Sequence, residues 1–230
     1  GEHGWGIPQL AAAAVGAGLL IGFVAVERRV PEPMLPPGLF AGRGFTVAVT
    51  VGFCLNVSFF GQLFVLSLFF QRTLGHDAWE AGLALAPQAC SAVVAAPLGG
   101  RVAARFGVFP AMLMGLVLGA AGFAGTAFIG SGTAPLVVSG VTFAAGFGMA
   151  FAMPAATAAA VSAVPDELAG TAGGIVNAAR QTGSVAGVAI LGGVVAADAS
   201  PSGFRVAMLM AAGIFIAAAA LVAAAARDPA

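Results

Sequence analysis

Long runs of apolar residues fill most of this sequence, and short segments rich in glycine, proline or polar residues separate them. A helix needs about 20 mostly apolar residues to cross a hydrocarbon core of roughly 30 Å, because lipid offers no partner to its backbone amides. The runs that reach this length are Ile7–Val26, Phe45–Phe70, Ala81–Gly100, Val108–Ile129, Pro135–Val161, Thr171–Ala196 and Phe204–Ala226. The pattern therefore predicts an all-α membrane protein, a polytopic bundle of about seven transmembrane helices.

The arginines indicate which way this bundle faces, since cytoplasmic loops and helix ends hold the excess of basic residues. An N-terminus outside the cell puts most arginines at the cytoplasmic face and leaves Arg72 and Arg205 outside. The cytoplasmic set is Arg28, Arg29, Arg43, Arg101, Arg105, Arg180 and Arg227. The use of arginine without lysine is typical of a GC-rich bacterial genome. We therefore expect a multi-pass protein of a bacterial plasma membrane, with its C-terminus in the cytoplasm.

Composition excludes several classes of function. The 230 residues are 60% hydrophobic and 8% charged, whereas roughly a quarter of a soluble domain is charged. Nine basic residues balance nine acidic ones, so no net field attracts nucleic acid. Cys54 and Cys90 lie in apolar runs and His3 lies far from His76, so we expect neither a metal site nor a catalytic triad. No enzyme activity is expected, because no span carries a nucleophile or paired carboxylates.

Two features predict that the chain is part of a longer protein. It does not open with Met, and its first apolar run lacks the basic residues that begin a signal peptide. No Asp, Glu, Lys or His lies in the middle of an expected span, although such a group is the usual mark of a proton relay. A proton carrier is therefore expected outside this segment.

The second expected span, Phe45–Phe70, combines amide side chains with many phenylalanines. Amides within a membrane need partners, and rings interleaved with neutral polar groups suit a cavity for bulky lipophilic molecules. Asn56, Phe59 and Gln62 are the candidates for lining a substrate cavity. Phenylalanines that face lipid explain most of the same pattern, so both interpretations remain open.

A polar stripe occupies the sixth expected span. Asn177, Arg180, Gln181 and Ser184 are spaced i, i+3, i+4 and i+7, which places them on one helix face near its cytoplasmic end. Such a face must meet protein or water. Asn177, Arg180 and Gln181 are candidates for a cytoplasmic gate or cavity wall. Interhelical hydrogen bonds, with an arginine that reaches the interface, explain the stripe equally well.

Helix packing accounts for two further features. Pro154 interrupts the fifth span, and a proline inside a helix removes one backbone hydrogen bond, so we expect a kink there. The pairs Gly115-x-x-x-Gly119 and Gly183-x-x-x-Gly187 allow helix backbones to approach closely, and we interpret them as packing sites.

The segment Gly100–Gly107 is expected to form a tight turn between two helices, with Arg101 and Arg105 facing the cytoplasm. It resembles the Gly-x-x-x-Asp-Arg-x-Gly signature that major facilitator transporters place between the second and third helices of each six-helix half. Ala104 stands where the family has the aspartate that helps to latch one conformation. Arg101 and Arg105 thus belong to a gate, as the resemblance implies, or only fix the topology.

A second resemblance covers nearly the whole chain. The stretch from Val164 to Gly183 is similar to the sequence that enters the next-to-last helix of fourteen-helix drug:proton antiporters of the EmrB/QacA type. Further matches to that family are Trp5, Glu27, Pro33 and the segment from Gly82 to Gln88. The resemblance implies the C-terminal half of such an antiporter.

This family assignment implies an organisation and an activity. Residues 1–44 would be an extra transmembrane helix with a cytoplasmic linker, and residues 45–230 the C-terminal bundle of two inverted three-helix repeats. The bundle would rock against a missing N-terminal half that carries the family's membrane carboxylates. The expected activity is proton-coupled export of small lipophilic drugs across the lipid bilayer, without cofactor or metal, the proton gradient supplying the energy.

Two alternatives fit the same residues. A facilitator dedicated to one metabolite differs from a drug exporter only in its substrate profile. A non-transporting membrane scaffold would explain the missing acidic, lysine and histidine residues in the spans, and a gene without an upstream transporter half would favour it.

Overall fold

The computed structural model describes residues 37–227 continuously, together with residues 15–16, 18–19, 21–22, 25–27 and 30. The chain divides into two compact units, Gly1–Leu39 and Phe40–Ala230. In the first unit the described residues form short helical pieces, except at position 30. Most of the expected span Ile7–Val26 lies outside the described residues. The predicted boundary between residues 44 and 45 stays a prediction.

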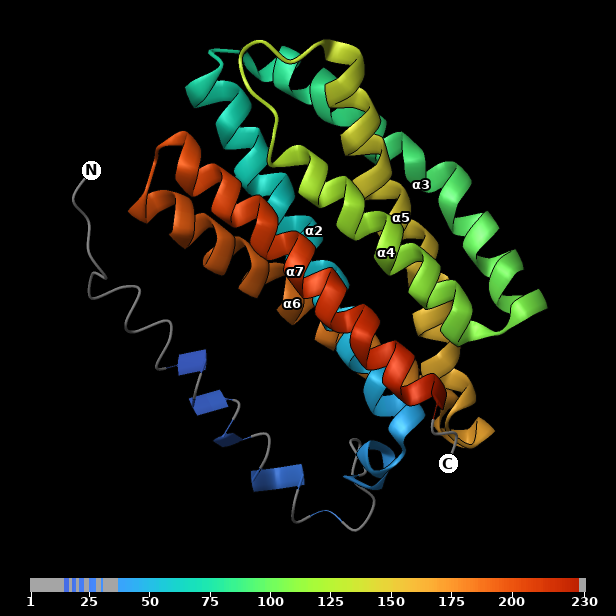
Figure 1. Cartoon of the computed structure of the whole chain (residues 1–230). Coiled ribbons are helices and arrows are strands. Elements are labelled where there is room, and N and C mark those ends of the chain that lie inside the picture. Colours follow the sequence, from blue (N-terminus) through green and yellow to red (C-terminus); the bar gives the residue numbers. More distant parts are fainter. Residues whose placement is uncertain are drawn as a thin grey trace. The chain divides into compact units, whose positions relative to one another are not determined.

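The second unit is a bundle of long helices (Figure 1). Within residues 43–227 they are α2 (Arg43–Leu68), α3 (Ala78–Phe106), α4 (Val108–Thr126), α5 (Pro135–Ser162), α6 (Ala169–Ala197) and α7 (Pro201–Arg227). Three shorter turns adjoin them: η1 (Pro37–Ala41) before α2, the π-helical turn η2 (Phe69–Thr73) after it, and η3 (Asp166–Leu168) before α6. Six of the expected spans are thus confirmed as helices, and residues 37–227 contain no strand.

Five of the described helices are long and apolar enough to cross a membrane, namely α2 with η2, α3, α4, α5 and α7. Helix α6 is not among them, although its 29 residues are long enough. Asn177, Arg180 and Gln181 interrupt its apolar run. Such a helix must turn its polar face toward protein or water.

Glycines in a left-handed conformation end two helices. Gly75, with φ +73°, follows η2, and Gly107, with φ +96°, joins α3 directly to α4. The expected turn Gly100–Gly107 is therefore wrong in extent, since α3 continues to Phe106 and the turn is Gly107 alone. The residues between Gly100 and Gly107 have helix-forming character, and only glycine tolerates this φ without strain.

Helix α3 begins with a capping box. The backbone N–H of Glu80 donates to Asp77 Oδ1 at 2.8 Å, and the backbone N–H of Asp77 donates to Glu80 Oε2 at 3.1 Å. Two amides that the helix itself leaves without partners are thereby satisfied.

Asp77→Ala is expected to lower the free energy of unfolding by about 1 kcal/mol, because the first turn of α3 loses its cap. The measurement is the thermal midpoint of the purified protein in detergent. Asp166→Ala is the matched control, because no side chain caps η3 or the start of α6. Equal losses from both substitutions would contradict the assignment.

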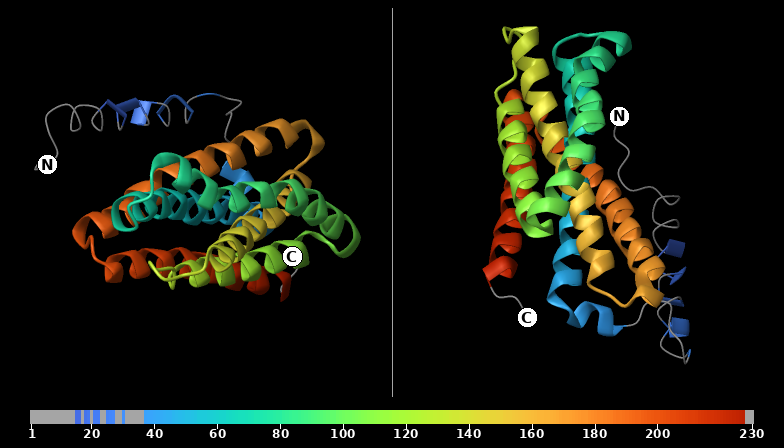
Figure 2. Two further views of the ribbon diagram at one scale, coloured as in Figure 1. Left: turned by 90° about the horizontal axis from the view of Figure 1, so that it is seen from above. Right: turned by 90° about the vertical axis from the view of Figure 1, so that its right-hand side faces the viewer.

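Helices α2 and α5 form the centre of the bundle. The most extensive pairings are α2 with α6, α5 with α3 and α5 with α4, and α2 also packs against α7 and α5. Viewed from above, α6 and α7 lie on opposite sides of α2 (Figure 2). The segments α2–α4 and α5–α7 therefore pack in equivalent ways. Helix α2 packs on α6 as α5 packs on α3, and α2 packs on α7 as α5 packs on α4. This pairing supports the expected division into two three-helix repeats.

Both predicted glycine pairs lie at helix crossings. A Cβ atom at Gly115 would lie 2.7 Å from the carbonyl oxygen of Gly148 on α5, and one at Gly183 would lie 2.5 Å from that of Phe53 on α2. Real Cβ atoms essentially never approach another atom within 3.0 Å. The packing interpretation is confirmed, since no larger residue permits these approaches.

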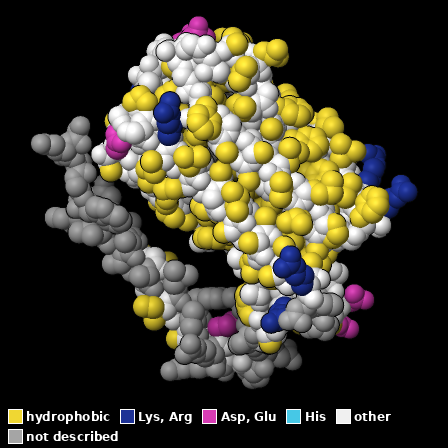
Figure 3. All heavy atoms as spheres, in the orientation of Figure 1, with side chains coloured by type: hydrophobic (Ala, Val, Ile, Leu, Met, Phe, Trp, Pro, Cys, Tyr) yellow, Lys and Arg dark blue, Asp and Glu magenta, His cyan; other side chains and the backbone are white. Residues whose placement is uncertain are grey.

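The surface agrees with a membrane environment. On the face shown in Figure 3, hydrophobic side chains cover the middle of the bundle, and the charged side chains lie toward its ends. Large apolar side chains such as Val93, Val117 and Leu136 are more than half exposed. A water-soluble bundle would bury such residues, so this band indicates contact with lipid.

Candidate functional site

Three polar side chains lie buried around the middle of α2. Ser58 is the central residue of the continuous segment Arg43–Thr73, and Asn56, Ser58 and Gln62 are each at most 1% exposed. The Ser58 hydroxyl donates to the carbonyl oxygen of Ala211 on α7 at 3.0 Å. The two predicted amides are therefore enclosed between helices in this conformation, and their role in lining a substrate cavity stays a prediction.

Asn56 connects α2 to the polar stripe of α6. Its Nδ2 donates to the carbonyl oxygen of Gly52 at 3.0 Å, and its Oδ1 accepts from the Ser184 hydroxyl at 3.3 Å. The Ser184 hydroxyl also lies 3.0 Å from the carbonyl oxygen of Arg180. The structure thus joins two segments that the sequence identified separately.

Arg180 lies next to this contact, with its aliphatic stem over α2. A Cβ atom at Gly52 would be 3.5 Å from Arg180 Cγ and 4.0 Å from Cδ. The Nε atom is buried and has no hydrogen-bond partner. The sequence placed the stripe near the end of the helix, whereas Arg180 and Ser184 lie on either side of Gly183, the central residue of α6.

A reciprocal pair of amides joins α2 to α3. Gln88 Nε2 donates to Gln62 Oε1 at 2.8 Å, and Gln62 Nε2 lies 3.5 Å from Gln88 Oε1. Both side chains are at most 2% exposed. The sequence analysis used Gln88 only as a family match. Its position inside the expected span Ala81–Gly100, where an amide needs a partner, was the available signal.

The remaining gate and cavity candidates are more open. Phe59 is half-buried and makes an edge-to-face contact with Phe60, at 5.3 Å between ring centroids. Asn177 and Gln181 are exposed on α6. These two residues are the exposed part of the polar stripe, and Arg180 and Ser184 are its half-buried part.

Arg101 and Arg105 lie on the last two turns of α3 and are exposed. The guanidinium of Arg105 lies 5.4 Å from the ring centroid of Phe106, a cation–π distance. Helix α3 ends and α6 begins at the same end of the bundle (Figure 1). Arg101 and Arg105 lie at that end, whereas the stripe of α6 extends to the middle of its helix. The gating role of both stays a prediction.

Comparison with known proteins identifies the family. The sequence matches the profile of the Major Facilitator Superfamily over residues 2–188. The chain belongs to the major facilitator superfamily. This is a superfamily of membrane transporters and not a class of enzymes, and the multi-pass helical fold agrees with it.

Several curated relatives in this superfamily are resistance or export proteins. The chain is 36% identical over 192 residues to the methylenomycin A resistance protein of Streptomyces coelicolor, covering 83% of the chain and 40% of the relative. It is 32% identical to the tetracenomycin C resistance and export protein of Streptomyces glaucescens, covering 82% and 35%. It is 33% identical to the multidrug resistance protein Stp of Mycobacterium tuberculosis, covering 83% and 35%. The chain thus spans two fifths or less of these relatives' length.

Three prolines of this facilitator bundle lie in the interior of α3 and α5. Pro154 is within α5, and Pro87 and Pro97 are within α3, although the sequence analysis singled out only the first. Each removes one hydrogen bond from the helix. The kink at Pro154 stays a prediction.

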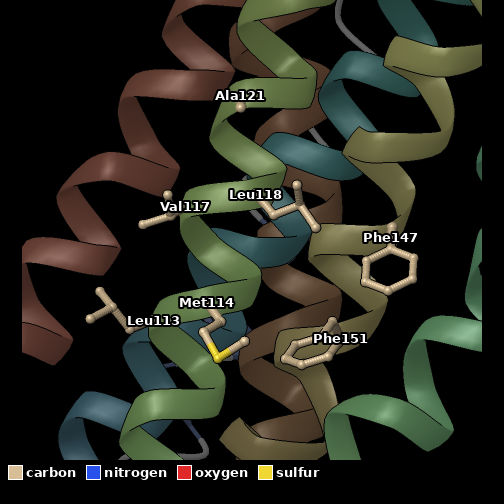
Figure 4. Close-up of a pocket in the computed structure, with 7 residues that line it drawn as sticks. All are labelled: Leu113, Met114, Val117, Leu118, Ala121, Phe147 and Phe151. Atoms are coloured by element: carbon tan, nitrogen blue, oxygen red, sulfur yellow. The ribbon is translucent and has the colours of Figure 1, made fainter.

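An apolar pocket of about 570 Å³ lies between α4 and α5. Figure 4 shows Met114 and Leu118 of α4 directed toward Phe147 and Phe151 of α5. No polar side chain lines it, so it offers no hydrogen bond that would orient a ligand.

A second pocket, of about 670 Å³, lies at the other end of the bundle from Gly107. The turn after η2, the start of α3 and the start of α5 form it, with His76, Glu80, Thr133 and Ser139 among its lining residues. The His76 ring stacks on Phe70 at 5.8 Å between centroids, and its Nδ1 is buried without a hydrogen-bond partner.

Proposed function

We propose that this chain supplies one helical bundle of a proton-coupled exporter of lipophilic drugs. The observation that carries the proposal is the polar contact between α2 and α6 at the middle of both helices, in a chain of a transporter superfamily. Facilitators bind substrate near the bilayer midplane, between two bundles that alternate in their access to either side. The names of several relatives, which refer to resistance and export, support the drug class.

The rest of the transporter would be an N-terminal bundle that packs on the polar side of α6. Asn177 and Gln181 are exposed there, and lipid is a poor neighbour for amides, so protein or a water-filled cavity is the favoured neighbour. On this proposal the chain begins outside, ends in the cytoplasm of a bacterial plasma membrane, and acts as a drug:proton antiporter of the fourteen-helix type. Residues 1–44 contribute an extra helix, and no cofactor takes part.

The test is the efflux of a fluorescent lipophilic cation from cells that express the complete gene, with and without an uncoupler that collapses the proton gradient. The expected result is energised efflux that the uncoupler abolishes. Cells with an empty vector are the control. Dye retention equal to that control would reject multidrug export.

A dedicated exporter is the second candidate, because two of the relatives are named for a single antibiotic. A panel of unrelated lipophilic compounds separates the two candidates. Resistance to several compounds favours a drug exporter, and resistance to one chemical series favours a dedicated exporter.

A further inference from the structure

The charge of Arg180 is uncompensated within the described part of the chain. Its side chain has no hydrogen bond or ion pair with any described residue, and its Nε is buried. An unpaired charge at membrane depth costs several kcal/mol in order of magnitude, even where water reaches it in part. A residue of this kind needs a partner that the described residues do not provide.

The carboxylates of residues 37–227 cannot provide that partner. Asp77 and Glu80 cap the start of α3, Asp166 and Glu167 lie in η3, and Asp198 follows the end of α6. All of them are at helix ends. Arg180 lies within one turn of the midpoint of a helix that is about 43 Å long at 1.5 Å per residue.

Packing against α2 fixes the direction in which the Arg180 side chain leaves α6. The stem of Arg180 packs over Gly52, one turn from the Asn56–Ser184 contact that fixes α6 against α2. The Asn56 amide already makes hydrogen bonds with Gly52 and Ser184, so it is not available to bind the partner of Arg180. Asn177 and Gln181 lie on the same helix face and are exposed, and their amides can donate to the same anion.

We propose that Arg180, with Asn177 and Gln181, binds a carboxylate near the middle of the membrane. A planar guanidinium matches a carboxylate with two parallel hydrogen bonds, which an ammonium or amide cannot do. The carboxylate belongs either to a lipophilic acid in the transport cavity or to a side chain of the other transporter bundle. The inference rests on the proposed function for the presence of that cavity, but its chemistry is testable without transport.

The first experiment measures the binding of 2-naphthoate to the purified full-length protein in detergent, with 2-naphthamide as the uncharged analogue of the same ring. If the carboxylate belongs to a substrate, the wild type is expected to bind naphthoate more tightly than naphthamide. Arg180→Met keeps the apolar stem over Gly52 and is expected to weaken naphthoate binding at least tenfold, with naphthamide binding unchanged. Arg205→Gln is the control, since Arg205 is exposed at the start of α7.

The second experiment compares thermal midpoints without ligand. If a side chain of the same protein supplies the carboxylate, Arg180→Met leaves that carboxylate unpaired and lowers the thermal midpoint by several degrees. Arg180→Lys keeps a positive charge beside the carboxylate and is expected to keep most of the wild-type stability. If a substrate supplies it, removing the unpaired charge leaves the midpoint unchanged or raises it. An unlowered midpoint together with no loss of naphthoate binding in Arg180→Met would overturn the proposal. Absent dye efflux from the wild type would reject drug export only, since neither experiment requires a gradient.

Discussion

Gly187→Ala is expected to destabilise the bundle strongly, because the added methyl group meets the backbone of α2. A Cβ atom at Gly187 would lie 2.8 Å from both the Cα and the carbonyl carbon of Val57, and the carbonyl oxygen is closer still. Helix backbone cannot yield as a side chain does, so α6 must shift outward. Overpacking of this kind costs about 1–3 kcal/mol. The expected result is a clearly lower thermal midpoint in detergent.

Gly193→Ala is the matched control in the same helix. A Cβ atom at Gly193 would have no atom within 4 Å, so the control lacks the clash. It gains the better helix propensity of alanine, worth up to about 1 kcal/mol in a helix interior. The two substitutions should therefore change the midpoint in opposite directions. A shift of equal sign in both would show that α6 does not approach α2 as described.

The positions of the helices could be predicted from the sequence. The thickness of the bilayer sets the length of a spanning helix, and each such helix needs an apolar run of that length in the sequence. The bounds of α4 and α5 differ from the expected spans by at most a few residues. The end of α3 could not be predicted, since Gly100 looks like a turn residue yet lies inside the helix. Of these two glycines at the ends of the expected turn, Gly100 and Gly107, only Gly107 has a φ that demands glycine.

The pairing of polar residues across helices could not be predicted, because it depends on the rotation and register of one helix against another. The sequence identified Asn56 and the α6 stripe separately, but spacing along one helix does not reveal that Ser184 faces Asn56. The bounds of α6 are not the reason that its stripe was placed near the helix end. The expected span Thr171–Ala196 and α6 have nearly the same midpoint, so the sequence already put Arg180 within one turn of that midpoint.

Gln88→Leu is expected to lower the stability of the bundle by about 1–2 kcal/mol, because the Gln62 amide then remains buried without a partner. The pair joins α2 to α3, two helices that otherwise make few contacts. Gln62→Leu should cost a similar amount for the same reason. The measurement for each is the thermal midpoint, compared with Gln71→Leu, which removes an exposed amide from the end of the same α2 segment.

The double substitution Gln62→Leu, Gln88→Leu separates a true amide pair from two unrelated amides. If the amides satisfy each other, removing both leaves no unpaired group, and the loss is smaller than the sum of the single losses by about 1 kcal/mol. Additive losses would mean that each amide has another partner. Polar pairs in membranes contribute about 0.6 kcal/mol on average, so a larger coupling here would reflect the near-complete burial of both side chains. In that case the amide pair, rather than apolar packing, holds α3 against α2 at this level of the bundle.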